Sequence, residues 1–235
     1  MPNVTDFLIG LDVSIYRAIN DLCGLNPTLD RIAVHAQIIQ GTIFVGIVGA
    51  LWFWPEDRKR RRETIIIMIL AIAVSLILNR TVSTLLPFRD RPMYALGAKA
   101  PSFPWHADLE HWSSFPSDTA TLLFAIAAGF WLGSRWLGLV FGVFALSTSL
   151  ARVYLGIHYP SDILVGALLG IATSIALNRD FVRRKIAAPI LAIETSYPPY
   201  FYGVFFVILS ELADGFPVAR RIAVAVVHLF RGYSR

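Results

Sequence analysis

Cysteine and charged residues are both scarce in this chain of 235 residues. The single cysteine, Cys23, excludes an internal disulfide framework and a cysteine-rich metal site. Charged residues make up 16% of the chain and hydrophobic residues 56%, whereas an ordinary soluble domain has about a quarter charged residues. The shortage of charge therefore indicates an integral membrane protein.

The net charge of +5 does not indicate a nucleic-acid-binding protein. Its Arg and Lys residues gather at the ends of apolar segments, which is where membrane proteins carry them. No basic face interleaved with aromatic residues is present, so we expect no nucleic-acid partner.

Residues 1–25 do not read as a cleavable signal peptide. They lack a basic start, and Asp6, Asp12, Arg17 and Asp21 interrupt any continuous apolar core. Their apolar residues recur instead at helical spacing, which predicts an amphipathic helix lying on the membrane surface. These residues are Phe7, Leu8, Leu11, Ile15, Ile19 and Leu22.

Six apolar segments are candidates for membrane-spanning helices, which need about 20 mostly apolar residues each. The sixth is short, and the apolar run 186–193 offers an earlier start for it. A further surface helix is expected over 218–230, where Arg220, Arg221 and His228 interrupt the apolar residues. The six segments are 32–54, 64–86, 117–132, 136–155, 161–177 and 200–212.

These segments predict an all-α fold with one bundle of transmembrane helices in a single membrane domain, 1–235. Within it we expect a surface helix (1–25), a core (26–178), and a last span with an amphipathic C-terminal segment (179–235). Small residues, among them Gly138, Gly142, Gly166 and Gly170, are expected to let the helices pack closely.

The basic residues predict the orientation of the bundle. The run 58–62 lies between the first two spans and is expected in the cytoplasm. Alternation then places the loops 87–115 and 156–160 on the outer face and returns the basic cluster at 179–185 to the inside. Arg220 and Arg221, beyond the sixth segment, do not follow this rule.

One outer connection carries three residues with chemical potential. Arg152 ends an apolar segment, where a charge is costly and marks function. His158 follows in a turn, and Asp162 starts the next helix. A carboxylate there can fix the imidazole tautomer and leave the other nitrogen as nucleophile or base. The alternative is that Asp162 only caps its helix and His158 lies at the membrane interface.

The other outer connection resembles an anion-binding site. Ser117 and Asp118 stand at a predicted helix start, whose free N–H groups bind anions. Arg89 and Arg91 are candidates to hold phosphate oxygens in bidentate pairs. Simple helix capping and contact with lipid headgroups are the alternatives.

The order Arg91-Pro92, then Pro116-Ser117, then Arg152 with His158 and Asp162 resembles the type 2 phosphatidic acid phosphatase family of membrane lipid phosphatases. That family has three motifs: Lys-x6-Arg-Pro, Pro-Ser-Gly-His and Ser-Arg-x5-His-x3-Asp. The resemblance covers residues 79–170. With Asp118 in the glycine position after Ser114-Phe115, the chain is most similar to the bacterial undecaprenyl-diphosphate phosphatase branch.

The resemblance implies phosphoryl transfer without a metal or other cofactor. It implies that His158 attacks phosphorus while Asp162 orients it, and that Arg91, Arg152 and Ser117 hold the phosphate oxygens. The implied substrate is a lipid-linked phosphate such as undecaprenyl diphosphate, taken from the lipid bilayer. The implied location is the bacterial inner membrane, with the site on its periplasmic or outer face.

Two departures from the family motifs matter for the chemistry. Thr84 stands where the family has lysine, and Arg80 or Arg89 are candidates to supply that charge. Thr119 stands where the family has the histidine that protonates the leaving group. His106 and His111 are candidate replacements, with loop histidines at the interface as the alternative reading.

Two other functions stay open at this stage. A non-catalytic relative that binds lipid phosphate would explain Thr84 and Thr119. An unrelated transporter would need polar residues at mid-membrane depth, of which the first span has His35, Gln37 and Gln40. The oligomeric state is not predicted.

Overall fold

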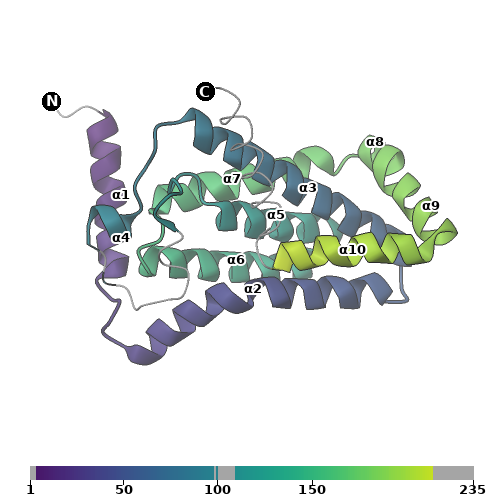
Figure 1. The fold of residues 1–235 in the computed structure, drawn as a ribbon, viewed down its shortest axis with the longest axis horizontal. Helices are drawn as coiled ribbons and strands as arrows, with labels where there is room; N and C mark the ends of the chain where they lie inside the picture. Colours follow the sequence, from purple (N-terminus) through teal and green to yellow (C-terminus); the bar gives the residue numbers. More distant parts are fainter. Residues whose placement is uncertain (1–3, 98, 100–108, 214–235) are drawn as a thin grey trace, which may run out of the picture.

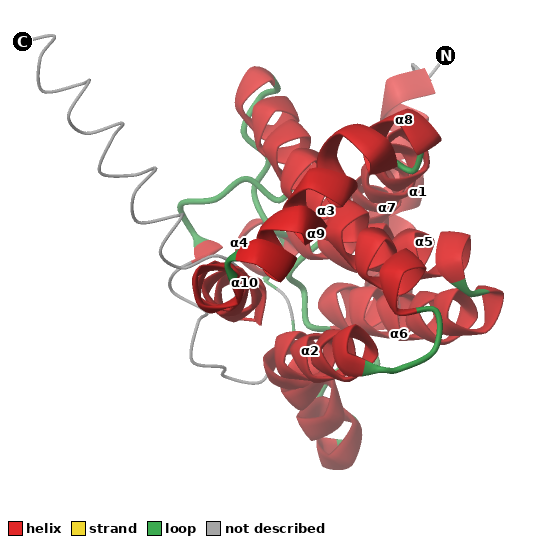
Figure 2. Cartoon of the chain, turned by 90° about the vertical axis from the view of Figure 1, so that its right-hand side faces the viewer, coloured by secondary structure: helices red, strands yellow, loops and turns green. Residues whose placement is uncertain are grey.

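The computed structural model describes residues 4–97, 99 and 109–213, and within them every regular element is helical (Figure 2). The predicted all-α membrane fold is therefore confirmed. The helices are α1 (Val4–Asn20), α2 (Pro27–Phe53), α3 (Arg58–Leu85), α4 (Pro92–Ala95), α5 (Asp118–Gly133), α6 (Arg135–Tyr154), α7 (Pro160–Leu177), α8 (Asp180–Val182), a π-helical turn (Arg183–Ala187), α9 (Ala188–Ser196) and α10 (Pro198–Ala213).

Four of these helices, α2, α3, α6 and α7, are long and apolar enough to cross a membrane. The other two predicted spans correspond to the shorter apolar helices α5 and α10. Of the two possible starts for the sixth segment, the later one is correct, because the run 186–193 belongs to the π-helical turn and α9. Proline suits the first turn of a helix, and α10 begins at Pro198. The helix expected over 218–230 lies outside the described residues.

Helix α5 lies at the centre of the bundle, packed against α3, α6 and α7 (Figure 1). Two glycines allow α7 to approach it closely. A Cβ added at Gly166 would lie 2.4 Å from the Ser117 carbonyl oxygen, and one at Gly170 would lie 2.3 Å from that of Thr121. The predicted packing role of these two glycines is confirmed. It was wrong for Gly142, where a Cβ would have no neighbour within 4 Å.

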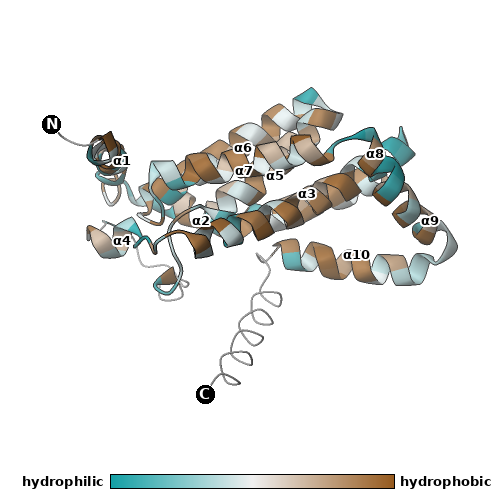
Figure 3. Cartoon of the chain, turned by 90° about the horizontal axis from the view of Figure 1, so that it is seen from above, coloured by the Kyte–Doolittle hydropathy of each residue, from teal (hydrophilic) through white to brown (hydrophobic). Residues whose placement is uncertain are grey.

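The two ends of the bundle differ in chemistry. Helices α1 and α4 lie at one end, and α8 and α9 lie at the other, where hydrophilic residues gather on α8 (Figures 1 and 3). An ion pair of 2.5 Å between Arg62 and Glu194 ties the start of α3 to α9 at that second end. The basic segments 58–62 and 179–185 therefore share one end, opposite the loops that carry the motifs.

Helix α1 lies across the first end of the bundle, with its axis crossing those of the long helices (Figures 1 and 3). Its buried residues are the polar Asp12, Tyr16 and Asn20. Apolar side chains such as Phe7 and Leu8 are 64% and 56% exposed. The predicted amphipathic helix is present, with its polar side against the protein and its apolar side outward.

Candidate active site

His158 lies in the turn between α6 and α7. Gly156 provides the turn with a φ of 72°, a conformation that glycine adopts without strain. The amide N–H groups of Ile157 and His158 donate to the Arg152 carbonyl at 2.9 and 3.4 Å. The turn is also tied to α4, because the Met93 N–H donates to the Gly156 carbonyl at 2.9 Å. The His158 backbone is therefore held from two sides.

The contacts of the His158 ring define its tautomer. Nδ1 lies 2.9 Å from the Ser114 carbonyl oxygen and 3.4 Å from Asp162 Oδ2, and both are acceptors. Arg91 Nη1, which can only donate, lies 3.2 Å from Nε2. The proton is thus assigned to Nδ1, and Nε2 carries the lone pair. Burial, and then the charge of Arg91, lower the His158 pKa to about 4, so the ring is neutral at pH 7.

Asp162 combines both roles considered for it. Its side chain is fully buried, and Oδ2 accepts a hydrogen bond of 2.8 Å from the Tyr159 N–H at the start of α7. The same oxygen accepts from the Ser114 hydroxyl and faces the His158 ring. Asp162 therefore caps its helix and holds the imidazole at once.

His158 opens on a cavity of about 430 Å³ that carries several guanidinium groups. Arg91 and Arg152 line it, as the sequence predicted, together with Arg80 from α3. Arg91 is 5% exposed and donates to the Ile157 carbonyl at 3.1 Å. Three positive charges and one neutral imidazole thus face a single space. Groups of three or more His, Cys, Asp or Glu residues that could hold a metal are absent from the described part of the chain.

Arg80 lines the cavity, whereas Thr84 does not. Its guanidinium carbon lies 4.4 Å from the centre of the Trp112 ring, a cation–π contact at the cavity wall. Thr84 is exposed, and its hydroxyl donates within its own helix to the Thr81 carbonyl at 2.9 Å. Of the two arginines considered for this gap, Arg80 is the one that lines the cavity.

The comparisons with known proteins agree with this geometry. Residues 63–186 match the model of the PAP2 superfamily, which is more than half of the chain. The chain belongs to the PAP2 superfamily. It is a lipid phosphatase, and a multi-pass membrane protein like its bacterial relatives.

Two curated relatives and one solved structure illustrate the similarity. The chain is 33% identical over 165 residues to YbjG of Escherichia coli (strain K12), covering 69% of this chain and 79% of that protein. It is 30% identical over 161 residues to the undecaprenyl-diphosphatase BcrC of Bacillus subtilis (strain 168), covering 68% and 79%. The crystal structure of Aquifex aeolicus LpxE aligns with a TM-score of 0.58 and 28% identity, covering 71% and 93%.

Arg89 has partners that the expected phosphate role did not anticipate. Its guanidinium donates to Asp162 Oδ1 and to Asp12 Oδ2, each at 2.6 Å, and lies 4.0 Å above the Tyr159 ring. It is not among the residues that line the PAP2 cavity. The structure therefore places Arg89 outside the cavity lining, held by two carboxylates, and contact of Arg89 with phosphate stays a prediction.

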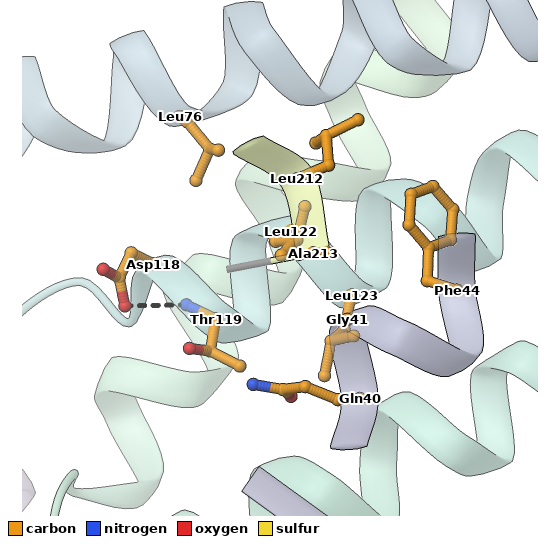
Figure 4. Close-up of a pocket in the computed structure, with 10 residues that line it drawn as sticks. All are labelled: Gln40, Gly41, Phe44, Leu76, Asp118, Thr119, Leu122, Leu123, Leu212 and Ala213. Carbon is orange, nitrogen blue, oxygen red and sulfur yellow. Dashed lines mark hydrogen bonds between the residues drawn. The ribbon is translucent and has the colours of Figure 1, made fainter. Parts of the chain in front are cut away.

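Ser117 and Asp118 share the helix start of the second PAP2 motif but face different ways. Ser117 is fully buried, and its hydroxyl accepts from the Ala120 N–H at 3.3 Å, so it caps α5 and does not line the cavity. Direct phosphate contact by its hydroxyl, which the resemblance implied, stays a prediction. Asp118 lines the cavity, and its Oδ1 accepts from the Thr119 N–H at 2.8 Å (Figure 4).

No replacement for the missing PAP2 histidine is found within the described residues. Thr119 lines the cavity at the position of the general acid. His111 is exposed and outside the cavity lining, so it does not supply the proton from this position. His106 lies outside the described residues. Among those described, His158 is the one imidazole that lines the cavity.

The sequence did not assign Gln37 and Gln40 to the site. Both come from α2 and line the cavity, and the Gln37 Oε1 accepts a hydrogen bond of 3.0 Å from Arg152 Nη1. In the sequence they were noted only, with His35, as polar residues at the mid-membrane depth that a transporter would need. Their spacing of three residues, which places them on one face of a helix, was the available signal.

A small apolar pocket of about 60 Å³ adjoins the charged cavity (Figure 4). Gln40, Asp118, Thr119 and Ala213 line both spaces. Beyond them the walls come from α2, α3, α5 and α10, through Gly41, Phe44, Leu76, Leu122, Leu123 and Leu212. The charged cavity therefore borders an apolar space at the position of Thr119.

Proposed function

We propose that this lipid phosphatase removes the terminal phosphate of a lipid diphosphate such as undecaprenyl diphosphate, without a metal, through a phosphohistidine on His158. The observation that carries this proposal is that His158, whose Nε2 lies 3.2 Å from Arg91 Nη1, lines the same cavity as Arg91 and Arg152. The Asp162 carboxylate supports it on the opposite side of the ring.

The first step forms a bond between His158 Nε2 and phosphorus and breaks the bond from phosphorus to the bridging oxygen. The lipid monophosphate leaves with the electron pair of that bond. Arg91 contacts His158 Nε2 in this structure. When the phosphate binds, the Arg91 guanidinium would contact the phosphate oxygens in place of Nε2. Arg152 and Arg80 balance the charge on the phosphoryl oxygens, and donors fixed in advance for such charge are the main source of catalysis. Water then attacks phosphorus, which releases inorganic phosphate and returns the neutral imidazole.

Thr119 supports a diphosphate substrate over a simple phosphate ester. An ester releases an alkoxide, which must be protonated as it leaves, and a missing general acid costs about 10²- to 10⁴-fold. A diphosphate releases a lipid phosphate, which is a stable anion and needs no such proton. The similarity to a relative named undecaprenyl-diphosphatase agrees with this choice.

The neighbouring apolar pocket suits the lipid part of the substrate. A phosphate seated between Arg91 and Arg152 would leave the first carbons of its chain near Thr119, where the walls become apolar. Burial of such carbons contributes about 0.8 kcal/mol per CH₂ group.

We place the site on the outer face of a bacterial inner membrane. The basic segments 58–62 and 179–185 lie at the opposite end of the bundle, and such segments favour the cytoplasmic side. Lipid diphosphates that are exposed at the periplasmic surface would reach the cavity there.

The test is phosphate release from undecaprenyl diphosphate by the purified protein. We expect turnover by the parent, loss of at least 10³-fold in His158→Ala, and unchanged turnover in His111→Ala, which alters an exposed histidine outside the cavity. Equal turnover in His158→Ala would overturn the assignment.

One observation favours a second candidate function, a protein that binds lipid phosphate without cleaving it: Thr119 faces the cavity where an acid is expected. A parent that binds undecaprenyl diphosphate but releases no phosphate would establish this alternative.

A further inference from the structure

The side of α1 that faces the protein is polar and touches the segment that carries His158. Asp12, Tyr16 and Asn20 follow one another at intervals of four residues, which places them on one face of the helix. Asn20 Nδ2 donates to the Tyr154 carbonyl at 2.8 Å. The rings of Tyr16 and Tyr159 meet edge to face with centroids 5.6 Å apart. This face of α1 therefore packs on both ends of the turn around His158.

Asp12 makes the most specific of these contacts. It is 8% exposed although it belongs to a helix on the rim of the bundle. Its Oδ1 accepts from the Ser161 N–H at 2.9 Å, and its Oδ2 accepts from the Ser161 hydroxyl at 2.5 Å. Oδ2 also accepts from Arg89 Nη2 at 2.6 Å. Asp12 thus binds both the start of α7 and a guanidinium group.

Arg89 carries the contact from Asp12 to the centre of the site. While Nη2 pairs with Asp12, Nη1 donates to Asp162 Oδ1 at 2.6 Å. The other oxygen of Asp162 lies 3.4 Å from His158 Nδ1. The unbroken series of contacts is therefore Asp12, Arg89, Asp162, His158.

We propose that Asp12 is a positioning residue of the active site: from the surface helix α1 it fixes Arg89 and Ser161, and through them the Asp162 carboxylate that orients His158. This inference rests on the proposed function. Asparagine at position 12 would remove one of the two carboxylates that hold Arg89, so its guanidinium would shift toward Asp162, the carboxylate that remains. Asp162 and the imidazole would then lose their fixed geometry, while the arginines that bind phosphate stay in place.

The variant that tests this role is Asp12→Asn, with Asp6→Asn as the matched control on the exposed side of the same helix. We expect kcat for undecaprenyl diphosphate to fall about tenfold in Asp12→Asn, with KM within twofold of the parent and no change in Asp6→Asn. A general loss of folding would lower the thermal midpoint and raise KM as well. Ser161→Ala removes one of the same contacts and should lower kcat by a smaller factor, in the same way.

A double-variant comparison tests whether Asp12 acts through Arg89. In an Arg89→Ala background, Asp12→Asn should lower kcat less than twofold further, because the main route to Asp162, through Arg89, is already broken and only the contact with Ser161 is left. A full additional tenfold loss would overturn the proposed route.

A second measurement does not need turnover: the rate at which diethyl pyrocarbonate modifies His158, followed by peptide mass spectrometry. We expect at least a threefold faster reaction in Asp12→Asn than in Asp6→Asn, with His111 reacting equally in both. A parent without phosphate release contradicts the proposed function, and this rate then decides the role of Asp12 alone. The inference would be overturned if Asp12→Asn and Asp6→Asn had equal kcat. If the parent shows no turnover, equal rates of His158 modification in the two variants would overturn it.

Discussion

Gln37 and Arg152 are joined across two helices by a hydrogen bond of 3.0 Å from Arg152 Nη1 to Gln37 Oε1. The Gln37 amide also donates to the Thr148 carbonyl at 3.3 Å, so the same side chain is anchored to α6. Both Gln37 and Arg152 are buried. A polar residue inside the first apolar span thus positions a guanidinium of the site.

Replacing Gln37 by leucine should lower catalysis by leaving Arg152 less well positioned. A hydrogen bond to a charged group contributes about 1.5–3 kcal/mol, so kcat for undecaprenyl diphosphate should fall tenfold or more. His35→Leu, on the exposed side of the same helix, serves as the control and should leave kcat unchanged. Steady-state kinetics of both variants give the two kcat values. Equal kcat in Gln37→Leu and His35→Leu would contradict the role of Gln37.

Thr119→His should change the choice of substrate. The new imidazole would supply the proton that an alkoxide leaving group needs, worth about 10²- to 10⁴-fold for such a substrate. Hydrolysis of undecaprenyl phosphate should therefore gain far more than hydrolysis of undecaprenyl diphosphate. The ratio of the two kcat/KM values measures this. A gain of the same factor for both lipids would show that Thr119 does not select for diphosphate.

The low pKa of His158 predicts activity that persists in acid. Only the neutral ring can attack phosphorus, and burial lowers its pKa from the ordinary 6.5 to about 4. Since protonation removes the nucleophile, kcat/KM should decline only as the pH approaches about 4, after correction for the titration of the substrate itself. A decline of kcat/KM centred near pH 6.5, the ordinary histidine pKa, would contradict the lowered pKa of His158.

Gly166→Ala should destabilise the contact between α5 and α7. The added Cβ would lie 2.4 Å from the Ser117 carbonyl oxygen, which is backbone at a capped helix start and cannot yield easily. Overpacking of this kind costs about 1–3 kcal/mol. The thermal midpoint should fall by several degrees, at about 2–4 °C per kcal/mol.

Gly142→Ala is the matched control for this prediction. It places the same methyl group on α6 where no atom lies within 4 Å, and alanine favours helix more than glycine does. Its midpoint should stay the same or rise. If the midpoint of Gly142→Ala fell as far as that of Gly166→Ala, close packing of α5 against α7 would not explain the effect at Gly166.

The sequence predicted well those features of the structure that a single segment of the chain determines. Apolar runs of sufficient length predicted the spanning helices, and the turn from Arg152 to His158 is local enough for motif spacing to place both side chains. Arg91 followed from the motif order. These inferences need no knowledge of which distant helices meet.

The sequence did not reveal side-chain contacts whose partner lies far along the chain. Arg89 looked like a phosphate ligand, because nothing near it in sequence shows that Asp12 and Asp162 would hold its guanidinium. Gln37 was given no role in the site, because its contact with Arg152, 115 positions away, is not visible in the sequence. Ser117 was assigned to the phosphate, but its burial beneath α7 turns its hydroxyl to the cap of α5.

The most direct measurement is to trap the covalent intermediate. The protein would be mixed with undecaprenyl diphosphate labelled at its terminal phosphate, stopped rapidly in alkali, digested, and searched for phosphohistidine by mass spectrometry. We predict acid-labile phosphate on the peptide that contains His158 and none in His158→Ala. Phosphate release that continues in His158→Ala, or label on another residue, would contradict the account.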